Sequence, residues 1–102
     1  MRQVMVRYKV KAGRAAENEA FITAVYEQLA REGLAGFRYA TIKLEDGLTF
    51  MHIVSDDRPD GPYDINTLSA FKAFTANIRD RCDEPPVTTK YDVVGSYRLF
   101  TD

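Results

Sequence analysis

The sequence of 102 residues has little of several things: one cysteine, one histidine and no tryptophan. The lone Cys82 cannot form an intrachain disulfide or supply a cluster of thiolate ligands. No apolar run approaches the roughly 20 residues that a membrane-spanning helix needs. Arg2 and Arg7 also interrupt the N-terminal region before the apolar core of a signal peptide can form. We therefore expect a cytoplasmic protein that does not enter a membrane.

The sequence also has no excess of either charge, because 14 Lys and Arg are balanced by 15 Asp and Glu, for a net charge of -1. Binding to a phosphate backbone needs a basic excess, so we expect no nucleic-acid partner. The content of 45% hydrophobic and 28% charged residues is ordinary for a soluble globular protein and excludes disorder. The length suits one core, and we expect a single domain over residues 1–102.

Motifs that bind metals or cofactors are missing as well. The sequence has no Gly-rich phosphate loop, CxxC pair, HExxH motif or Ser/His/Asp set. The acidic segment 56–66 matches a calcium loop at Asp56, Asp60 and Gly61, but Arg58 and Thr67 stand where oxygen ligands belong. We predict a solvated loop there, and neither a metal nor a cofactor.

What is present predicts regular structure in the first half of the chain. Alternation from Gln3 to Val10 indicates a strand. Over residues 14–32, apolar side chains recur every fourth residue, which indicates an amphipathic helix that ends at Gly33. Two further extended runs, 37–45 and 48–55, are joined by Asp46-Gly47 and predict an antiparallel hairpin.

The second half of the chain predicts one more helix and one more strand. Asn66 or Thr67 can cap a helix that buries one apolar stripe, made of Phe71, Phe74, Ile78 and Cys82. Pro85-Pro86 is expected to stop that helix, and a last strand is predicted from about Val87 to Phe100. The order β-α-β-β-α-β predicts an α+β, ferredoxin-like fold with two helices on one face of a four-stranded antiparallel sheet.

Two helices leave the other sheet face open, and the strands carry apolar side chains on both faces. We expect the helix side to take Val4, Val6, Tyr8, Ala40, Ile42, Met51 and Ile53. The open side then presents Met5, Arg7, Tyr39, Thr41, Phe50, His52 and Val54. Such a surface is too apolar for water, and no remaining segment is long enough to cover it. We therefore expect a homodimer through the open sheet face.

The sequence resembles the dimeric α+β barrel superfamily, and within it the antibiotic-biosynthesis monooxygenase-like proteins. The resemblance rests on the element order, on segments 47–53 (GLTFMHI) and 68–74 (LSAFKAF), and on RCDEPP at 81–86 followed by VGSYR at 94–98. It implies two sheets packed face to face in a dimer. It also implies an active site in the barrel or between the sheet and the helices, without fixing a reaction.

Six residues are candidates for chemistry in such a site. His52 is a candidate general base, or else a hydrogen-bonded imidazole of purely structural role. Tyr39 and Tyr97 can orient the oxygens of a substrate, or can anchor an interface. Arg7 can stabilise an anion, or can pair with an acidic residue of the second copy. Phe50 and Met5 would contact the substrate.

These residues support two hypotheses. The first is a cofactor-independent monooxygenase or cyclase that acts on a small aromatic or polyketide-like molecule, with His52, Tyr39 and Arg7 as catalytic residues. The second is a non-catalytic homodimer that binds a small ligand or is only structural. A cavity beside His52 favours an enzyme or a carrier, whereas a filled interior favours structure alone.

Overall fold

The computed structural model of the chain describes residues 2–58, 61 and 63–100. Its elements in chain order are β1 (Arg2–Val10), α1 (Ala15–Glu32), β2 (Phe37–Lys43), β3 (Thr49–Asp56), the 3-10 turn η1 (Ile65–Thr67), α2 (Ser69–Thr75), α3 (Ile78–Arg81) and β4 (Cys82–Lys90). Three residues of the predicted 56–66 loop, Pro59, Asp60 and Pro62, lie outside the described residues.

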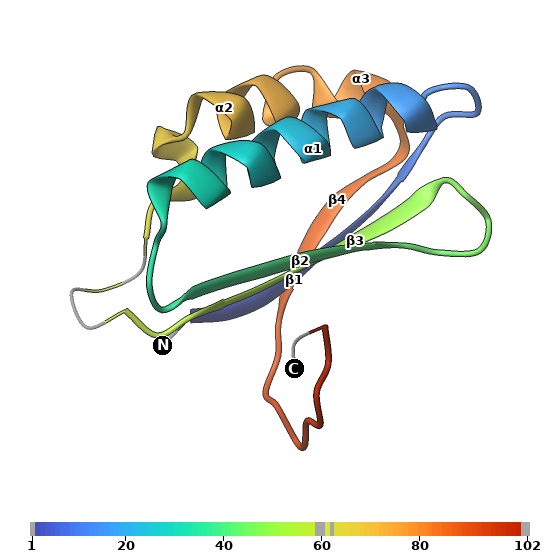
Figure 1. Ribbon diagram of the computed structural model, residues 1–102. Helices are drawn as coiled ribbons and strands as arrows, with labels where there is room; N and C mark the ends of the chain where they lie inside the picture. The colour runs from blue at the N-terminus through green and yellow to red at the C-terminus, as the bar shows by residue number, and fades with distance from the viewer. Residues whose placement is uncertain (1, 59–60, 62, 101–102) are drawn as a thin grey trace.

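The four strands form one antiparallel sheet in the order β2-β3-β1-β4. The helices α1, α2 and α3 lie together on one face of this sheet, and the C-terminal segment 91–100 runs beneath the other face (Figure 1). This two-layer arrangement confirms the predicted ferredoxin-like α+β fold. Among the described residues, no helix is long and apolar enough to cross a bilayer.

The predicted first helix and hairpin are confirmed almost to the residue. Gly33 adopts the left-handed conformation, with φ of 62°, and its N–H donates to the Leu29 carbonyl that closes α1. In the hairpin turn Gly47 has φ of 72°. The Asp46 carboxylate accepts hydrogen bonds from the Thr49 hydroxyl and from the backbone N–H groups of Leu48 and Thr49. These bonds, with the Thr49 hydroxyl first, lower the pKa of Asp46 to about 2.

The predicted second helix is broken in two. Between α2 and α3 the backbone of Asn77 is left-handed, with φ of 61°. The buried Arg81 guanidinium fills the break and donates to the carbonyls of Phe74, at 2.5 Å, and Ala76, at 3.3 Å. It also lies over the ring of Phe21, 4.7 Å from the centroid. A buried cation thus satisfies carbonyls that would otherwise be orphaned at the end of α2.

The predicted end of the helix and the predicted last strand both need correction. Cys82 is buried in the core as expected, but it begins β4 instead of ending a helix. Pro85-Pro86 lies inside β4, which an edge strand tolerates because one row of its N–H groups faces away from the sheet. The pairing with β1 shifts there, so a bulge absorbs the prolines. The strand stops at Lys90 and does not reach Phe100.

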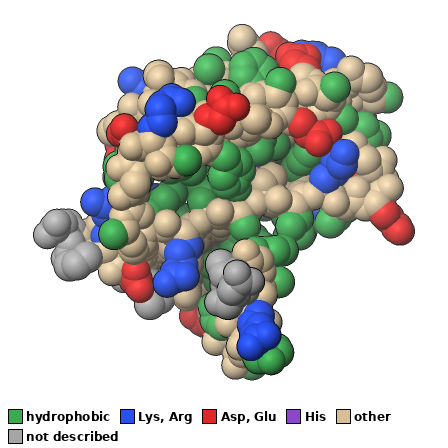
Figure 2. Space-filling model, viewed as in Figure 1, with side chains coloured by type: hydrophobic (Ala, Val, Ile, Leu, Met, Phe, Trp, Pro, Cys, Tyr) green, Lys and Arg blue, Asp and Glu red, His purple; other side chains and the backbone are tan. Residues whose placement is uncertain are grey.

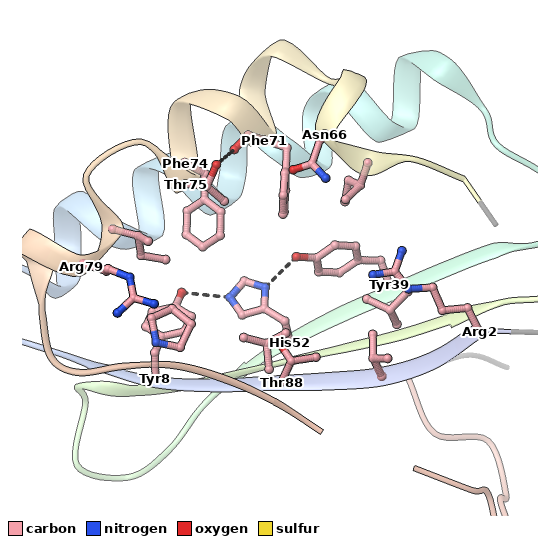
Figure 3. A pocket seen from close by; sticks show the side chains of 16 residues that line it. Arg2, Tyr8, Tyr39, His52, Asn66, Phe71, Phe74, Thr75, Arg79 and Thr88 are labelled. Carbon is pink, nitrogen blue, oxygen red and sulfur yellow. Dashed lines mark hydrogen bonds between the residues drawn. The ribbon is translucent and has the colours of Figure 1, made fainter. Parts of the chain in front are cut away.

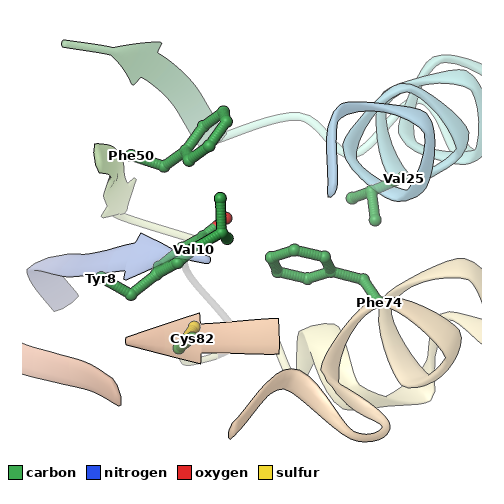
Figure 4. Close-up of a cluster of buried hydrophobic side chains, with 6 residues drawn as sticks. All are labelled: Tyr8, Val10, Val25, Phe50, Phe74 and Cys82. Atoms are coloured by element: carbon green, nitrogen blue, oxygen red, sulfur yellow. The ribbon is translucent and has the colours of Figure 1, made fainter. Parts of the chain in front are cut away.

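The core lies between the sheet and the helices. Six buried side chains form it: Tyr8, Val10, Val25, Phe50, Phe74 and Cys82 (Figure 4). Hydrophobic side chains also gather between the helical layer and the sheet in the space-filling view (Figure 2). The predicted helix stripes contribute as expected, since Val25 and Phe74 are buried and their stripe neighbours pack against the same cluster.

The sheet faces predicted for β2 and β3 were wrong. Tyr8 lies directly opposite Phe50 in the ladder, and Val6 lies opposite His52. Residues opposite each other in a ladder share a face, so Phe50 and His52 join Tyr8 on the helix side. The β2 pairing carries Tyr39 and Thr41 to the same side, opposite Val54 and His52. The outer face instead holds Met5, Arg7, Ala40, Ile42, Met51 and Ile53. A shift by one residue exchanges the two faces of a strand, and alternation alone cannot set it.

Candidate functional site

A cavity of about 370 Å³ lies between the sheet and the α2–α3 layer, and we call it the interlayer cavity (Figure 3). Its volume is within the range of about 300–1,000 Å³ typical of small-molecule sites. The sheet contributes Arg2, Val4, Val6, Tyr8, Tyr39, His52, Val54, Pro86 and Thr88, and the other layer contributes Ile65, Asn66, Phe71, Phe74, Thr75, Ile78 and Arg79. Its walls are therefore mostly apolar, with a few polar groups set among them.

His52 is the centre of a hydrogen-bonded network in this cavity. Its Nε2 lies 2.9 Å from the Tyr8 hydroxyl, and its Nδ1 lies 2.8 Å from the Tyr39 hydroxyl. The Thr41 hydroxyl is 3.1 Å from the same Nδ1. Beyond these neighbours, the Asn18 amide nitrogen donates to the Tyr8 hydroxyl at 2.8 Å. Four secondary elements, β1, α1, β2 and β3, thus fix one imidazole.

Counting donors and acceptors gives the tautomer of His52. Because the Tyr8 oxygen accepts from Asn18, its own hydrogen is available to His52 Nε2, which then acts as the acceptor. A neutral imidazole carries its proton on the other nitrogen, so Nδ1–H donates to the Tyr39 oxygen at 2.8 Å, with the Thr41 hydroxyl at 3.1 Å as a second, more distant acceptor. Tyr39 therefore keeps its hydroxyl hydrogen for a ligand in the cavity. A hydroxyl that accepts one strong hydrogen bond becomes a better donor itself.

Burial sets the charge state of this network. His52 is 4% exposed, and burial lowers its pKa to about 4, so the imidazole is neutral at pH 7. Burial also raises the pKa of Tyr39 and of Tyr8 above that of a free tyrosine, so both hydroxyls stay protonated. The network is a set of neutral donors and acceptors, and such groups suit a ligand oxygen on which negative charge develops.

The geometry bears directly on the two roles considered for His52. Its Nε2 lone pair faces the Tyr8 hydroxyl, and a pKa of about 4 makes the imidazole a weak base at neutral pH. A good general base has a pKa near the working pH. The arrangement therefore favours a hydrogen-bonding His52 that orients Tyr39.

The other candidate residues lie elsewhere. Phe50 is 1% exposed and stacks on Tyr8 with centroids 5.7 Å apart, in the core and outside the cavity lining. Arg7 and Met5 are on the outer sheet face, where the Arg7 guanidinium lies 3.9 Å from Glu84 of the same chain. Tyr97 is 83% exposed in the C-terminal segment. The structure thus brings together His52 and Tyr39 and separates them from the remaining four.

The sequence pattern did not identify several residues of the site. The sequence predicts the correct face for Tyr8 and places Thr41 on the same face as His52, but it assigns a site role to none of Tyr8, Thr41, Asn18 and Tyr26. Asn18 is fully buried on α1, in a helix face otherwise used for packing. A buried polar residue at an apolar helical position was the available signal, because such a group costs stability unless it is bonded. Tyr26 lies behind Thr41, with their hydroxyls 2.8 Å apart.

Within the described residues, no three His, Cys, Asp or Glu side chains gather closely enough to hold a metal ion. Phe71 and Phe74 of α2 line the opposite wall of the cavity, and the Phe74 ring lies 5.3 Å from the His52 ring. These rings offer flat apolar surfaces to a planar ligand.

Comparison with known proteins adds information on the fold. A scan against protein-family models gives no match for this chain, and a search of curated proteins gives no significant match. Solved structures do match. An antibiotic biosynthesis monooxygenase superimposes with a TM-score of 0.73 at 12% identity, over 93% of this chain and 100% of that one.

Two further structures show the range of these similar proteins. A variant of SnoaB, a cofactor-independent oxygenase from Streptomyces nogalater, matches with a TM-score of 0.65 at 17% identity, over 92% of this chain and 93% of that one. A protein of unknown function from Nitrosomonas europaea matches with a TM-score of 0.70 at 19% identity, over 93% and 90% of the two chains. At these identities the similarity concerns the fold: this chain has the ferredoxin-like α+β fold of the antibiotic biosynthesis monooxygenase-like proteins.

Proposed function

We propose that this chain is a cofactor-independent oxygenase that oxidises a small aromatic, polyketide-like molecule in the interlayer cavity. The observation that carries the proposal is the Tyr39 hydroxyl, which accepts from a neutral His52 and keeps its own hydrogen for a ligand among apolar walls. The shared fold with SnoaB, a cofactor-independent oxygenase, supports it.

The reaction needs only the substrate and dioxygen. An activated ring methylene, flanked by aromatic rings and conjugated with a phenol or ketone, loses a proton to solvent water and gives an electron-rich enolate that O2 oxidises. The methylene becomes a carbonyl whose oxygen comes from O2, and the other oxygen atom leaves as water with the two methylene hydrogens. The four electrons that reduce O2 all come from the substrate.

Each residue of the network has a part in this step. Tyr39 is the proposed catalytic residue, since its hydroxyl donates to the substrate oxygen that becomes negative in the enolate. His52 is a positioning residue that acts through Tyr39, and Tyr8 and Asn18 hold its tautomer. The Phe71 and Phe74 rings form the wall on which the substrate rings stack.

The first test is oxygen uptake with 1,8-dihydroxyanthrone, a three-ring phenol with a ring methylene. We expect the purified protein, dialysed against a chelator, to consume one O2 for each anthraquinone formed and to exceed the rate in buffer alone. Cyclisation of a substrate would consume no oxygen, so measuring oxygen uptake with an oxygen electrode distinguishes an oxygenase from a cyclase. A rate no higher than in buffer, with this probe and with its monohydroxy analogue, would contradict the proposal.

One observation favours a second candidate function, a non-catalytic ligand carrier. Both His52 nitrogens are engaged within the network, so the described lining residues of the cavity offer no strong base. A carrier would bind 1,8-dihydroxyanthraquinone, the product of the proposed reaction. It would consume no oxygen when the anthrone is added. An oxygenase binds the ring system and turns it over.

We further propose that two copies pair through the outer sheet face. The middle of this face is apolar, with Met5, Met51 and Ile53 side by side across the ladder. Exposed apolar side chains of the C-terminal segment add to it: Val93, Val94, Tyr97, Leu99 and Phe100. Arg7 and Glu84, one cation and one anion on the same face, can also pair across a two-fold axis. We propose that a second copy of this chain covers this face.

The oligomeric state tests this pairing directly. We expect twice the chain mass of 11.6 kDa in native mass spectrometry and in light scattering. Replacing Met51 by Lys places a charge in the middle of the apolar face and is expected to give a monomer, whereas Lys72→Gln on α2 leaves the mass unchanged. A wild-type monomer at micromolar concentration would overturn the pairing.

A further inference from the structure

The charged groups of the interlayer cavity are of one sign. Arg2 and Arg79 belong to its lining, and the lining residues that the structure describes include no Asp or Glu. Within the described residues, neither arginine has an ion-pair partner, because the three ion pairs present involve other side chains. The two side chains lie at different ends of the cavity, Arg79 beside Tyr8 and Arg2 beside Tyr39 (Figure 3).

A third cation reinforces this sign. Arg81 is 2% exposed, and its guanidinium meets backbone carbonyls and aromatic rings in place of a carboxylate. The Arg81 guanidinium lies 5.6 Å from the centroid of the Phe74 ring, which lines the cavity. Arg81 is buried, so water screens its charge little, whereas Arg2 and Arg79 are exposed and act on a ligand by direct pairing.

We propose that the ligand of the interlayer cavity is an aromatic acid, whose carboxylate is held at one end of the cavity by the guanidinium group of Arg2 or of Arg79. This inference rests on the proposed function, because it names the substrate class of the same site. The ring system lies against Phe71 and Phe74, a ring oxygen meets Tyr39, and the carboxylate reaches an arginine at the end of the cavity. Guanidinium groups suit this task because they pair with carboxylates in a bidentate manner.

The test compares two ligands that differ only in charge, 1-hydroxy-2-naphthoate and 1-hydroxy-2-naphthamide. The protein has no tryptophan, so the naphthol fluorescence reports binding with little background. We expect the acid to bind at least about tenfold more tightly than the amide, which is about 1.4 kcal/mol. We also expect added salt to weaken only the binding of the acid.

The variants locate the effect. In the double variant Arg2→Gln/Arg79→Gln the preference for the acid is expected to disappear, with the affinity for the amide unchanged. A matched control, Arg31→Gln/Lys72→Gln, removes the same charge from exposed helix positions outside the cavity lining and keeps the preference.

The outcomes separate this inference from the proposed function. Equal binding of acid and amide overturns the anionic ligand and leaves the aromatic cavity in place. A preference that survives in the cavity double variant overturns the role of the two arginines. Failure of both ligands to bind contradicts the aromatic site itself, and the proposed function falls with it.

Discussion

Replacing Tyr39 by Phe is expected to lower kcat with 1,8-dihydroxyanthrone by about 10²–10³-fold, the usual effect of removing one donor to a developing oxyanion. The ring that packs against Phe37 and Tyr26 is retained, so the fold is preserved. The variant loses only the hydroxyl that lies between His52 Nδ1 and the ligand. Initial rates of oxygen uptake at saturating substrate measure the effect.

Two controls make this result specific. Tyr97→Phe removes an exposed hydroxyl from the C-terminal segment and is expected to leave kcat unchanged. The circular dichroism and the thermal midpoint of Tyr39→Phe should stay close to wild type. A folded Tyr39→Phe protein with wild-type turnover would show that the Tyr39 hydroxyl takes no part in the reaction.

The stability of the protein is expected to fall by about 3 kcal/mol as the pH drops from about 6.5 to about 4. The pKa of His52 is about 4 in the folded chain, because of burial, against 6.5 in the unfolded chain. Between these values the unfolded chain binds more protons, so acid favours unfolding. The stability that depends on a neutral His52 is fully present above about pH 6.5. It is lost as the pH falls to the pKa of about 4 that His52 has in the folded chain. Urea denaturation at half-unit pH steps measures it.

His52→Gln is the matched variant for this dependence. Since His52 is the one histidine in the sequence, the variant is expected to have a nearly flat stability between pH 7 and pH 5.5, whatever its absolute stability. Below pH 5.5 the protonation of carboxylates also changes the stability. Asp46 is protonated last, because its pKa is about 2. An unchanged slope in His52→Gln would mean that the imidazole is not buried in its neutral form.

The two experiments examine different properties of one network. Tyr39→Phe removes the hydroxyl that donates to the substrate and leaves the His52 imidazole in place. The pH series measures how protonation of His52 changes the free energy of unfolding. If the pH slope appears and Tyr39→Phe is fully active, the buried His52 network is structural, and the cavity fits a carrier better than an oxygenase.

Local patterns in the sequence were sufficient for most of the fold. Alternating apolar and polar residues predicted β1 and the hairpin, and apolar residues at every fourth position predicted α1. Glycines at 33 and 47 marked positions that need a left-handed backbone. These features depend on neighbours a few residues apart, so the sequence contains their causes. The break at Asn77 was missed because it depends on Arg81, whose guanidinium takes over carbonyls of α2.

The sequence by itself determined the element order, and with it the ferredoxin-like sheet, and it named His52 and Tyr39, together with Arg7, as catalytic candidates. Only the tertiary structure decided which face of the sheet carries each of them. Alternation defines two faces for each strand, while the phase between strands follows from the cross-strand register of Tyr8 with Phe50 and Val6 with His52. That register put His52 and Tyr39 under the helices, beside Tyr8 and Asn18, because only there can their polar groups satisfy one another away from water.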